Sequence, residues 1–247
     1  MESKQLYTVL GVLSFLGTCA VVLGCAVSFA AIKLVGEKRL SGWAEGAAGW
    51  IFGGKGLARK ILIVALVLLA GYSGALFAAS LGSHEWNLQP GAEKYICDLD
   101  CHIAYAVTGA TKAATIGAEG SKVAAQGVFY IVAVRTRFDE TTISPRRGNA
   151  PLEPGPRIVT LVDADGNSYR PSETALRALQ DTGVASTPIT QPLRPGESHI
   201  SMYVFNLPAS AQNPRLLIET KVAWPDKILI GGEDSLLHKK VYLRLPA

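Results

Sequence analysis

Two long apolar runs without a charged residue constrain this chain more than any other feature of its sequence. Residues 6–32 form an uncharged stretch of 27 residues, and residues 61–82 form a second one of 22. A helix of about 20 apolar residues crosses the hydrocarbon core of a bilayer, so both runs are long enough to span it. The sequence therefore predicts two transmembrane helices, 6–32 and 61–83.

The first run is expected to be a retained anchor and not a cleaved signal peptide. The apolar core of a signal peptide is usually about 7–15 residues long, which is much shorter than this run. The chain starts with Met1-Glu2-Ser3-Lys4, which is barely basic, and the apolar run continues past Cys25 to Ile32. A lipoprotein would turn polar after its cleavage-site cysteine, so lipoprotein processing is the alternative.

The basic residues between the two runs predict the orientation in the membrane. The loop 33–60 carries six Lys and Arg residues, whereas the tail 1–5 carries one. The positive-inside rule then places the loop in the cytoplasm. Both termini are expected on the periplasmic side of a bacterial inner membrane. Trp43 and Trp50 are expected to anchor the loop at the level of the lipid headgroups.

Small residues recur at every fourth position in both runs. Such stripes let the backbones of two helices approach closely. We expect the two helices to pack on each other as a hairpin, and the alternative is that one stripe faces a partner subunit. Neither run holds an ionisable residue, which disfavours a transporter or proton channel. The stripes are Ala20, Gly24 and Ser28 in the first run and Ala70, Gly74 and Ala78 in the second.

The rest of the chain has the pattern of an antiparallel β-sandwich. Residues 84–124 are expected to be a linker and residues 125–247 the sandwich itself. Runs of β-branched and aromatic residues are separated by Pro-Gly turns, which is typical of short strands. A short helix is predicted at 172–179, with Ser172 as its N-cap. The predicted strands are 128–134, 157–162, 168–170, 199–205, 215–222 and 239–245.

Charge and motifs exclude several functions for the outer domain. Residues 83–247 contain 17 basic and 17 acidic residues, so there is no positive excess for nucleic acid. Asp163 and Asp165 flank a tight turn and are assigned to turn geometry. His199 alternates with Ser201, which suits an exposed strand face. The chain has no nucleophile elbow and no zinc-protease motif, so we expect neither an enzyme nor a small-molecule substrate.

Turn motifs within residues 125–222 follow a distinctive order. An early strand at 126–130 precedes the hairpin Leu161-Val162-Asp163-Ala164-Asp165-Gly166, and Leu193-Arg194-Pro195-Gly196-Glu197 leads into a strand that ends in Val204-Phe205. This order resembles uncharacterised immunoglobulin-like domains of secreted and membrane-tethered bacterial proteins. The resemblance implies an immunoglobulin-like fold and a non-enzymatic interaction or structural module. We therefore expect an α+β membrane protein, a two-helix transmembrane hairpin followed by an immunoglobulin-like antiparallel sandwich.

Cys97, Cys101 and His102 form a C-x-x-x-C-H motif on the oxidising side of the membrane. A disulfide between the two cysteines is the favoured interpretation, because an oxidising compartment oxidises close pairs. Covalent haem is an alternative, although the usual C-x-x-C-H motif is one residue shorter. Copper is another, since thiolate and imidazole suit it. Two helices before a sandwich resemble cytochrome oxidase subunit II, but Tyr105 stands where its copper-site histidine would be. Reduced thiols are the remaining case.

These observations lead to one expected function and one alternative. We expect an accessory or assembly subunit that holds its sandwich on the outer face of a larger membrane complex, respiratory or photosynthetic. Its partners would be membrane lipid and other subunits of that complex, with no cofactor. The alternative is a membrane-anchored redox protein that carries haem c or copper at Cys97, Cys101 and His102.

The disulfide can be tested by the mass of the protein isolated from its native membrane. A peptide that contains both Cys97 and Cys101 should weigh two hydrogens less than its reduced form, with no other added mass. The same measurement on a Cys97→Ser, Cys101→Ser double variant is the control. A mass increase of one haem on the native peptide would contradict the disulfide, because haem attachment uses both thiols.

Overall fold

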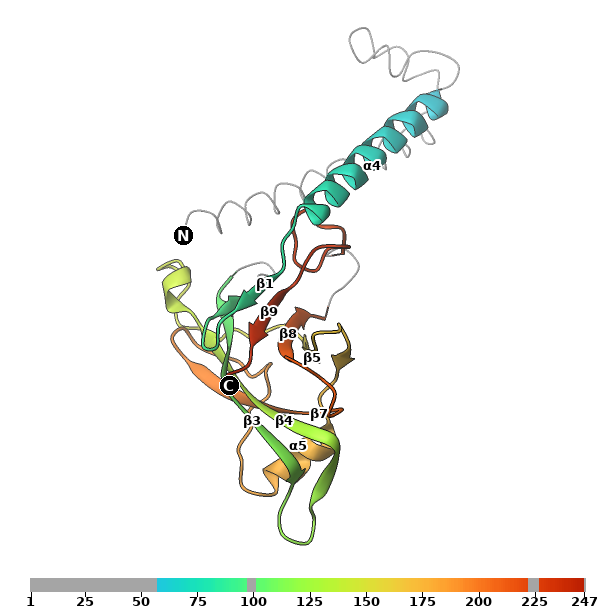
Figure 1. Ribbon diagram of the computed structural model, residues 1–247. Helices are drawn as coiled ribbons and strands as arrows, with labels where there is room; N and C mark the ends of the chain where they lie inside the picture. Colours follow the sequence, from blue (N-terminus) through green and yellow to red (C-terminus); the bar gives the residue numbers. More distant parts are fainter. Residues whose placement is uncertain (1–56, 97–100, 222–226, 247) are drawn as a thin grey trace. The chain divides into compact units, whose positions relative to one another are not determined.

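The computed structural model describes residues 57–96, 101–221 and 227–246. The chain divides into two compact units, which are described separately (Figure 1). The described part of the first unit contains helix α4 (Leu57–Leu81) and residues 227–238. The second contains residues 84–221 and 239–246. The predicted helix 6–32, with Ala20, Gly24 and Ser28, and the loop residues Trp43 and Trp50 lie outside the described residues.

Helix α4 contains the second predicted transmembrane segment and begins four residues before Ile61. Leucine and alanine, both strong helix formers, make up much of it. Within the described ranges it is the one helix that is long and apolar enough to cross a membrane, over Ile63–Leu81 with a mean hydropathy of 2.0. Only 11% of this window is buried, so α4 is not the core helix of a globular domain. A two-helix hairpin is not shown, because only this helix is described.

Residues 227–238 lie against one side of α4 in the first unit. The hydroxyl of Tyr72 donates a hydrogen bond to the carbonyl oxygen of Ile228, at 2.6 Å. Leu76 and Ser80, one and two turns further along the same side, are buried. One side of α4 is therefore covered, and its apolar surface elsewhere remains exposed.

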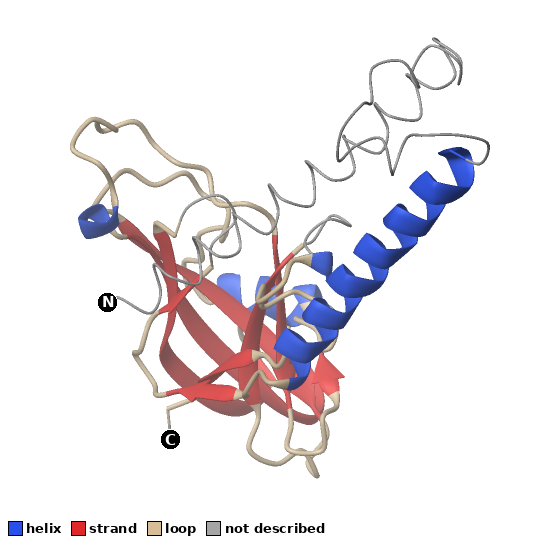
Figure 2. Ribbon diagram, turned by 90° about the horizontal axis from the view of Figure 1, so that it is seen from above, coloured by secondary structure: helices blue, strands red, loops and turns tan. Residues whose placement is uncertain are grey.

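The second unit is a β-sandwich of two sheets (Figure 2). The five-stranded sheet has the order β1-β9-β8-β5-β6, and the four-stranded sheet has the order β2-β3-β4-β7. The strands are β1 (Trp86–Leu88), β2 (Lys94–Tyr95), β3 (Ile103–Ile116), β4 (Val123–Phe138), β5 (Arg157–Val162), β6 (Ser168–Tyr169), β7 (Ser198–Leu207), β8 (Arg215–Thr220) and β9 (Val241–Arg244).

The main core lies between the two sheets. Alternate residues of β4 point into it, among them Val132 and Val134, because successive side chains of a strand point to opposite faces. They pack with residues of the five-stranded sheet such as Leu161 and Ile218, which are fully buried. Each such side chain contributes about 1.5–3 kcal/mol relative to its exposed state. This core confirms the predicted sandwich.

Helix α5 (Glu173–Gln180) covers the outer face of the four-stranded sheet. Its buried residues Ala178 and Leu179 pack against Phe129 of β4 and Val204 of β7. The Ser172 hydroxyl accepts a hydrogen bond from the backbone N–H of Ala175, at 3.3 Å. The predicted short helix and its N-cap are therefore confirmed.

The expected linker contains three strands of the sandwich. β1, β2 and β3 all lie within residues 84–124, and β3 pairs with β4 from Ile103 opposite Phe138 to Ile116 opposite Val123. β3 is rich in alanine, threonine and glycine, and its pairing with the long strand β4 supplies the hydrogen bonds that its composition alone does not predict. One pair also departs from the expected antiparallel pattern, because β1 runs parallel to β9.

Lys94 connects the two sheets from inside the sandwich. It belongs to β2 of the four-stranded sheet and is only 3% exposed. Its Nζ donates hydrogen bonds to the carbonyl oxygens of Ile218, at 2.8 Å, and Val241, at 3.0 Å, both in the five-stranded sheet. A buried ammonium group costs several kcal/mol unless it is hydrogen-bonded, so these bonds hold β2 against the opposite sheet.

Gly127 of β4 generates a prediction about packing. A Cβ there would lie 2.7 Å from the backbone nitrogen of Ala209 and closer still to the carbonyl oxygen of Leu207. We expect Gly127→Ala to lower the free energy of unfolding of the sandwich by about 3 kcal/mol, because backbone must move. Denaturant unfolding of the full chain in detergent, followed by near-UV circular dichroism, measures this.

The matched control is Gly109→Ala on the neighbouring strand β3. A Cβ at Gly109 would meet the Ala133 Cβ at 3.8 Å, an ordinary contact. This variant should unfold within about 1 kcal/mol of the wild type. Equal destabilisation by both substitutions would contradict the packing account.

Candidate functional site

The cysteine–histidine motif lies between β2 and β3 of the sandwich. Cys97 and residues 98–100 are outside the described residues, and the chain resumes at Cys101, two residues before β3. Cys101 is disulfide-bonded, and its partner is among the residues that are not described. The pairing of Cys101 with Cys97 therefore stays a prediction.

His102 is held against the end of β4. Its Nδ1 is 2.7 Å from the hydroxyl oxygen of Thr142, and its ring stacks on Phe138 with centroids 5.8 Å apart. Its carbonyl oxygen accepts a hydrogen bond from the backbone N–H of Asp139, at 2.8 Å. These contacts tie the motif to the short helix η2 (Glu140–Thr142). In the described part of the chain, no three His, Cys, Asp or Glu side chains form a metal-binding group. Haem c or copper at Cys97, Cys101 and His102 stays an untested alternative.

Five polar side chains next to this motif form a network on the outer face of the four-stranded sheet. Arg137 binds both carboxylate oxygens of Glu93, with its Nε at 2.7 Å and its Nη2 at 2.6 Å. Its Nη2 is also 3.2 Å from the carboxylate of Asp139. We call this network the clasp, and its members are Glu93, Tyr95, Arg135, Arg137 and Asp139.

Small residues of β3 allow the clasp to form. Glu93 and Tyr95 lie on or beside β2, and the two arginines lie on β4, with β3 between them. Ala104 and Ala106 of β3 stand opposite Arg137 and Arg135 in the strand register, and both are fully buried. Their short side chains leave room for the arginines to reach across β3. The clasp thereby fixes the turn that carries the cysteines onto the long strand β4.

The clasp keeps its two carboxylates ionised. Hydrogen bonding to Arg137 is the largest influence on Glu93 and lowers the pKa of that carboxyl. Burial on its own would raise the pKa of Asp139, but hydrogen bonds from Tyr95, Thr141 and Arg137 outweigh it and hold the pKa well below its usual range. Burial and the bond to Asp139 raise the pKa of Tyr95. None of these groups is suited to proton transfer near neutral pH, so the clasp acts as a structural support.

A row of polar side chains also faces the core of the sandwich. Tyr105, Thr136 and His199 are register partners on β3, β4 and β7, and Ser201 follows on the same face of β7. The prediction that His199 and Ser201 suit an exposed face was wrong, because this face is covered by the opposite sheet: Ser201 is 2% exposed. Burial lowers the pKa of His199, which the nearby Pro188 carbonyl opposes. Arg157 donates a hydrogen bond to the Tyr105 hydroxyl, at 3.0 Å.

The small-residue stripe of α4 lies opposite the side that residues 227–238 cover. Ala70, Gly74 and Ala78 are all exposed, and a Cβ at Gly74 would meet nothing within 4 Å. At about 100° per residue, this stripe is nearly half a turn from Tyr72, Leu76 and Ser80. Among the described residues, the stripe therefore faces no neighbour.

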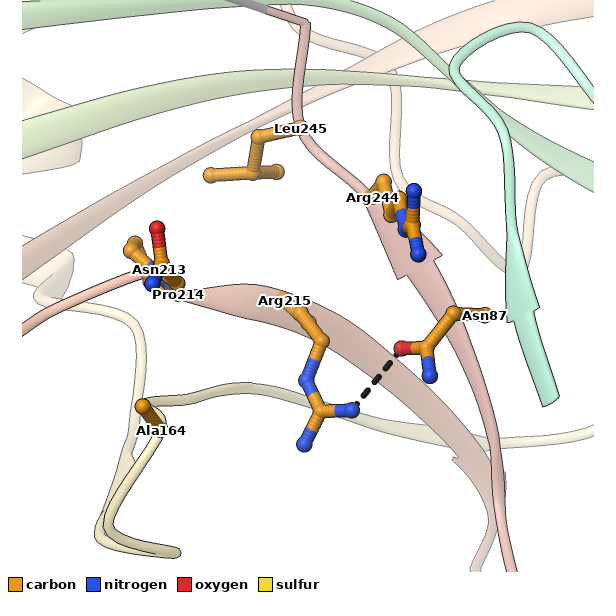
Figure 3. A pocket seen from close by; sticks show the side chains of 7 residues that line it. All are labelled: Asn87, Ala164, Asn213, Pro214, Arg215, Arg244 and Leu245. Atoms are coloured by element: carbon orange, nitrogen blue, oxygen red, sulfur yellow. Dashed lines mark hydrogen bonds between the residues drawn. The ribbon is translucent and has the colours of Figure 1, made fainter. Parts of the chain in front are cut away.

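A shallow hollow opens at one edge of the five-stranded sheet (Figure 3). Its volume is about 540 Å³. The side chains of Arg215 and Asn87 point toward each other across it, joined by a hydrogen bond (Figure 3). The hollow brings together β1, β8 and β9, which are far apart in the sequence. Its lining residues are Asn87, Ala164, Asn213, Pro214, Arg215, Arg244 and Leu245.

Sequence reasoning missed the clasp and this hollow. The alternation Arg135-x-Arg137-x-Asp139 at the end of a buried strand was the available signal, because it places three charges on one strand face. The hollow left no such signal, since its two arginines are 29 residues apart and meet only through strand pairing. Both features depend on contacts between distant segments.

Comparison with known proteins gives a limited result. The sequence matches no protein-family model and no curated protein. Three solved structures are similar to the chain at low identity. One is the secreted Mycobacterium tuberculosis protein MPT63, with 10% identity over 66% of this chain and 99% of that one, at a TM-score of 0.39. Another is YjhA from Bacillus subtilis, with 12% identity over 64% and 99%, at 0.40. An uncharacterised β-sandwich protein from Clostridium difficile has 9% identity over 66% and 96%, at 0.35.

Asp139 allows a test of the clasp by pH. Its folded pKa lies below the unfolded value of about 3.9, so its stabilising effect is complete above that value and is lost as pH falls toward the folded pKa. We expect Asp139→Asn to lower the free energy of unfolding by about 2–3 kcal/mol between pH 5 and 8. The gap between wild type and variant should narrow below about pH 4.

The control for this measurement is Asp165→Asn, which changes an exposed aspartate in a turn. It should unfold within about 0.5 kcal/mol of the wild type across the same pH range. A gap for Asp139→Asn that stays constant down to pH 2 would show that its carboxylate is not held by the clasp.

Proposed function

We propose that this chain is a non-enzymatic accessory subunit that holds an immunoglobulin-like sandwich on the outer face of a larger membrane complex. The exposed apolar surface of α4 carries the proposal. Leu66 is 54% exposed, Val67 65% and Leu69 61%. Apolar surface in water costs about 25 cal/mol for each Å², so lipid or other protein must cover this helix.

The finer topology of the proposal comes from the distribution of charge. A second span at 6–32 and a cytoplasmic loop at 33–60 agree with the excess of basic residues in that loop. The sandwich would then be periplasmic. An oxidising periplasm would also suit a disulfide between Cys97 and Cys101, next to the clasp.

The exposed stripe on α4 is the proposed contact with another subunit. Ala70, Gly74 and Ala78 present a flat surface on which the helix of a partner could approach closely. Leucines and valines flank the stripe and would face lipid. This is the partner alternative to the hairpin, and the exposure of the stripe in the described residues favours it.

The charges of the sandwich support a scaffold role. Many of them are engaged within the domain, as in the clasp and in the pair of Lys240 and Glu219, at 2.9 Å. Such pairs fix strands to one another and leave little net charge to steer a charged substrate. A respiratory or photosynthetic complex of the electron-transport chain is the proposed host.

The contact can be tested by adding bulk to the stripe. Gly74→Leu should shift the chain, solubilised from native membranes in mild detergent, from a large assembly to a smaller species on a native gel, because the close helix contact is lost. The expected loss is at least tenfold in the assembled fraction, and the amount of chain in the membrane should not change.

The control is Ala75→Leu, which adds a larger side chain at an exposed position about 100° further around α4. It should assemble as the wild type does. If the wild-type chain itself migrates as a single free subunit, or if both variants assemble normally, the proposed subunit role is wrong.

A further inference from the structure

The hollow at the edge of the five-stranded sheet has two arginines directly opposite each other. Arg215 of β8 and Arg244 of β9 are register partners, and both line the hollow. Like charges that face each other on neighbouring strands destabilise a sheet. An arrangement of this kind is stabilised when a negative group lies between the two charges.

Arg215 is held in one orientation by three contacts. Its guanidinium carbon lies 4.1 Å from the centre of the Tyr242 ring. Its Nη1 donates to the side-chain oxygen of Asn87, at 2.8 Å, and pairs with the carboxylate of Glu85. The bond from Arg215 is the main reason that the pKa of Glu85 is lowered. The contacts use Nη1, which leaves Nη2 and Nε as donors toward a ligand.

Arg244 has no such compensation. It is exposed, and within the described ranges no hydrogen bond or ion pair engages its guanidinium. Glu85 balances Arg215, so the charge of Arg244 remains for an anion. Asn213 adds an amide to the rim, and Pro214 and Leu245 supply apolar lining.

We propose that this hollow binds a phosphate group between Arg215 and Arg244. One guanidinium satisfies the two oxygens of a carboxylate, whereas a phosphate offers further acceptor oxygens and can accept from two guanidinium groups at once. Phosphate is therefore the anion that matches two opposed arginines.

The phosphate can come from an anionic phospholipid or from free phosphate ion. Asn87 follows Leu81, the last residue of α4, by six residues. Six residues of chain span at most about 20 Å, so headgroups are within reach if α4 ends at the membrane surface. This lipid source rests on the proposed membrane anchoring, whereas binding of free phosphate does not.

The experiment uses the full chain with three substitutions. Arg244→Gln removes the uncompensated charge, and Arg244→Lys keeps the charge but loses the guanidinium geometry. Arg170→Gln is the matched control, because Arg170 is exposed, lies outside the hollow and loses the same charge. In the free-phosphate arm, calorimetry measures the dissociation constant of inorganic phosphate for the chain in nonionic detergent. In the lipid arm, native mass spectrometry counts phosphatidylglycerol and phosphatidylcholine molecules retained by the chain from mixed nanodiscs.

We expect Arg244→Gln to weaken phosphate binding, or the preference for phosphatidylglycerol, by about tenfold, which is typical of one lost charged hydrogen bond. Arg244→Lys should fall between this variant and the wild type, and Arg170→Gln should match the wild type. An effect in the lipid arm alone assigns the headgroup as the source, and an effect in the phosphate arm alone assigns the free ion.

If Arg244→Gln and Arg170→Gln behave alike in both arms, the inference is overturned while the membrane anchoring stands. If the chain does not enter nanodiscs but binds phosphate through Arg244, the hollow is a phosphate site and the proposed membrane function fails.

Discussion

The buried ammonium group of Lys94 is the interaction on which this end of the sandwich depends. Its hydrogen bonds to Ile218 and Val241 hold the two-residue strand β2 against the opposite sheet. Because neighbours of a strand residue point to the other face, placing Lys94 inward places Glu93 and Tyr95 outward. The clasp with Arg137 and Asp139 follows from that, and so does the position of the turn that carries Cys97 and Cys101. A single buried cation thus links the core, the ionic network and the cysteine motif.

The two units of the chain have opposite relations to solvent. The sandwich buries its large apolar side chains between its sheets and against α5, whereas α4 leaves most of its apolar window exposed. The hydrophobic effect does not allow α4 to remain in water, so the proposed membrane setting is the simplest environment that satisfies both units. The exposed stripe on α4 and the arginine hollow on the sandwich then give the subunit two separate contacts, one with protein and one with phosphate.

The sequence predicted elements whose signals are local. The apolar run after Lys60 predicted α4, Ser172 predicted the start of α5, and the run 157–162 predicted β5 with its printed bounds. Asp163 is also a turn residue as predicted, since its carboxylate accepts hydrogen bonds from the backbone N–H groups of Asp165 and Asn167. In each case the residues that decide the structure are close together in the chain.

What the sequence did not predict depends on distant pairing. β3 has too few β-branched and aromatic residues for a strand signal, and it forms because β4 and the core accept it. Lys94 gives no sign of burial, because its hydrogen-bond partners are 124 and 147 residues away. His199 and Ser201 were assigned to the wrong face, since polar residues were assumed to point to water. The hollow of Arg215 and Arg244 likewise exists only once β8 and β9 are paired.

The central claim is that the sandwich stands on the outer face of the membrane, anchored through α4. The most direct test is labelling of a single engineered cysteine, Glu119→Cys, at the exposed turn between β3 and β4. The reagent is a membrane-impermeant maleimide, applied to cells with a permeabilised outer membrane and an intact inner membrane, with the wild-type chain as background. The account predicts that position 119 is labelled in these cells. Labelling only after the inner membrane is opened would contradict it.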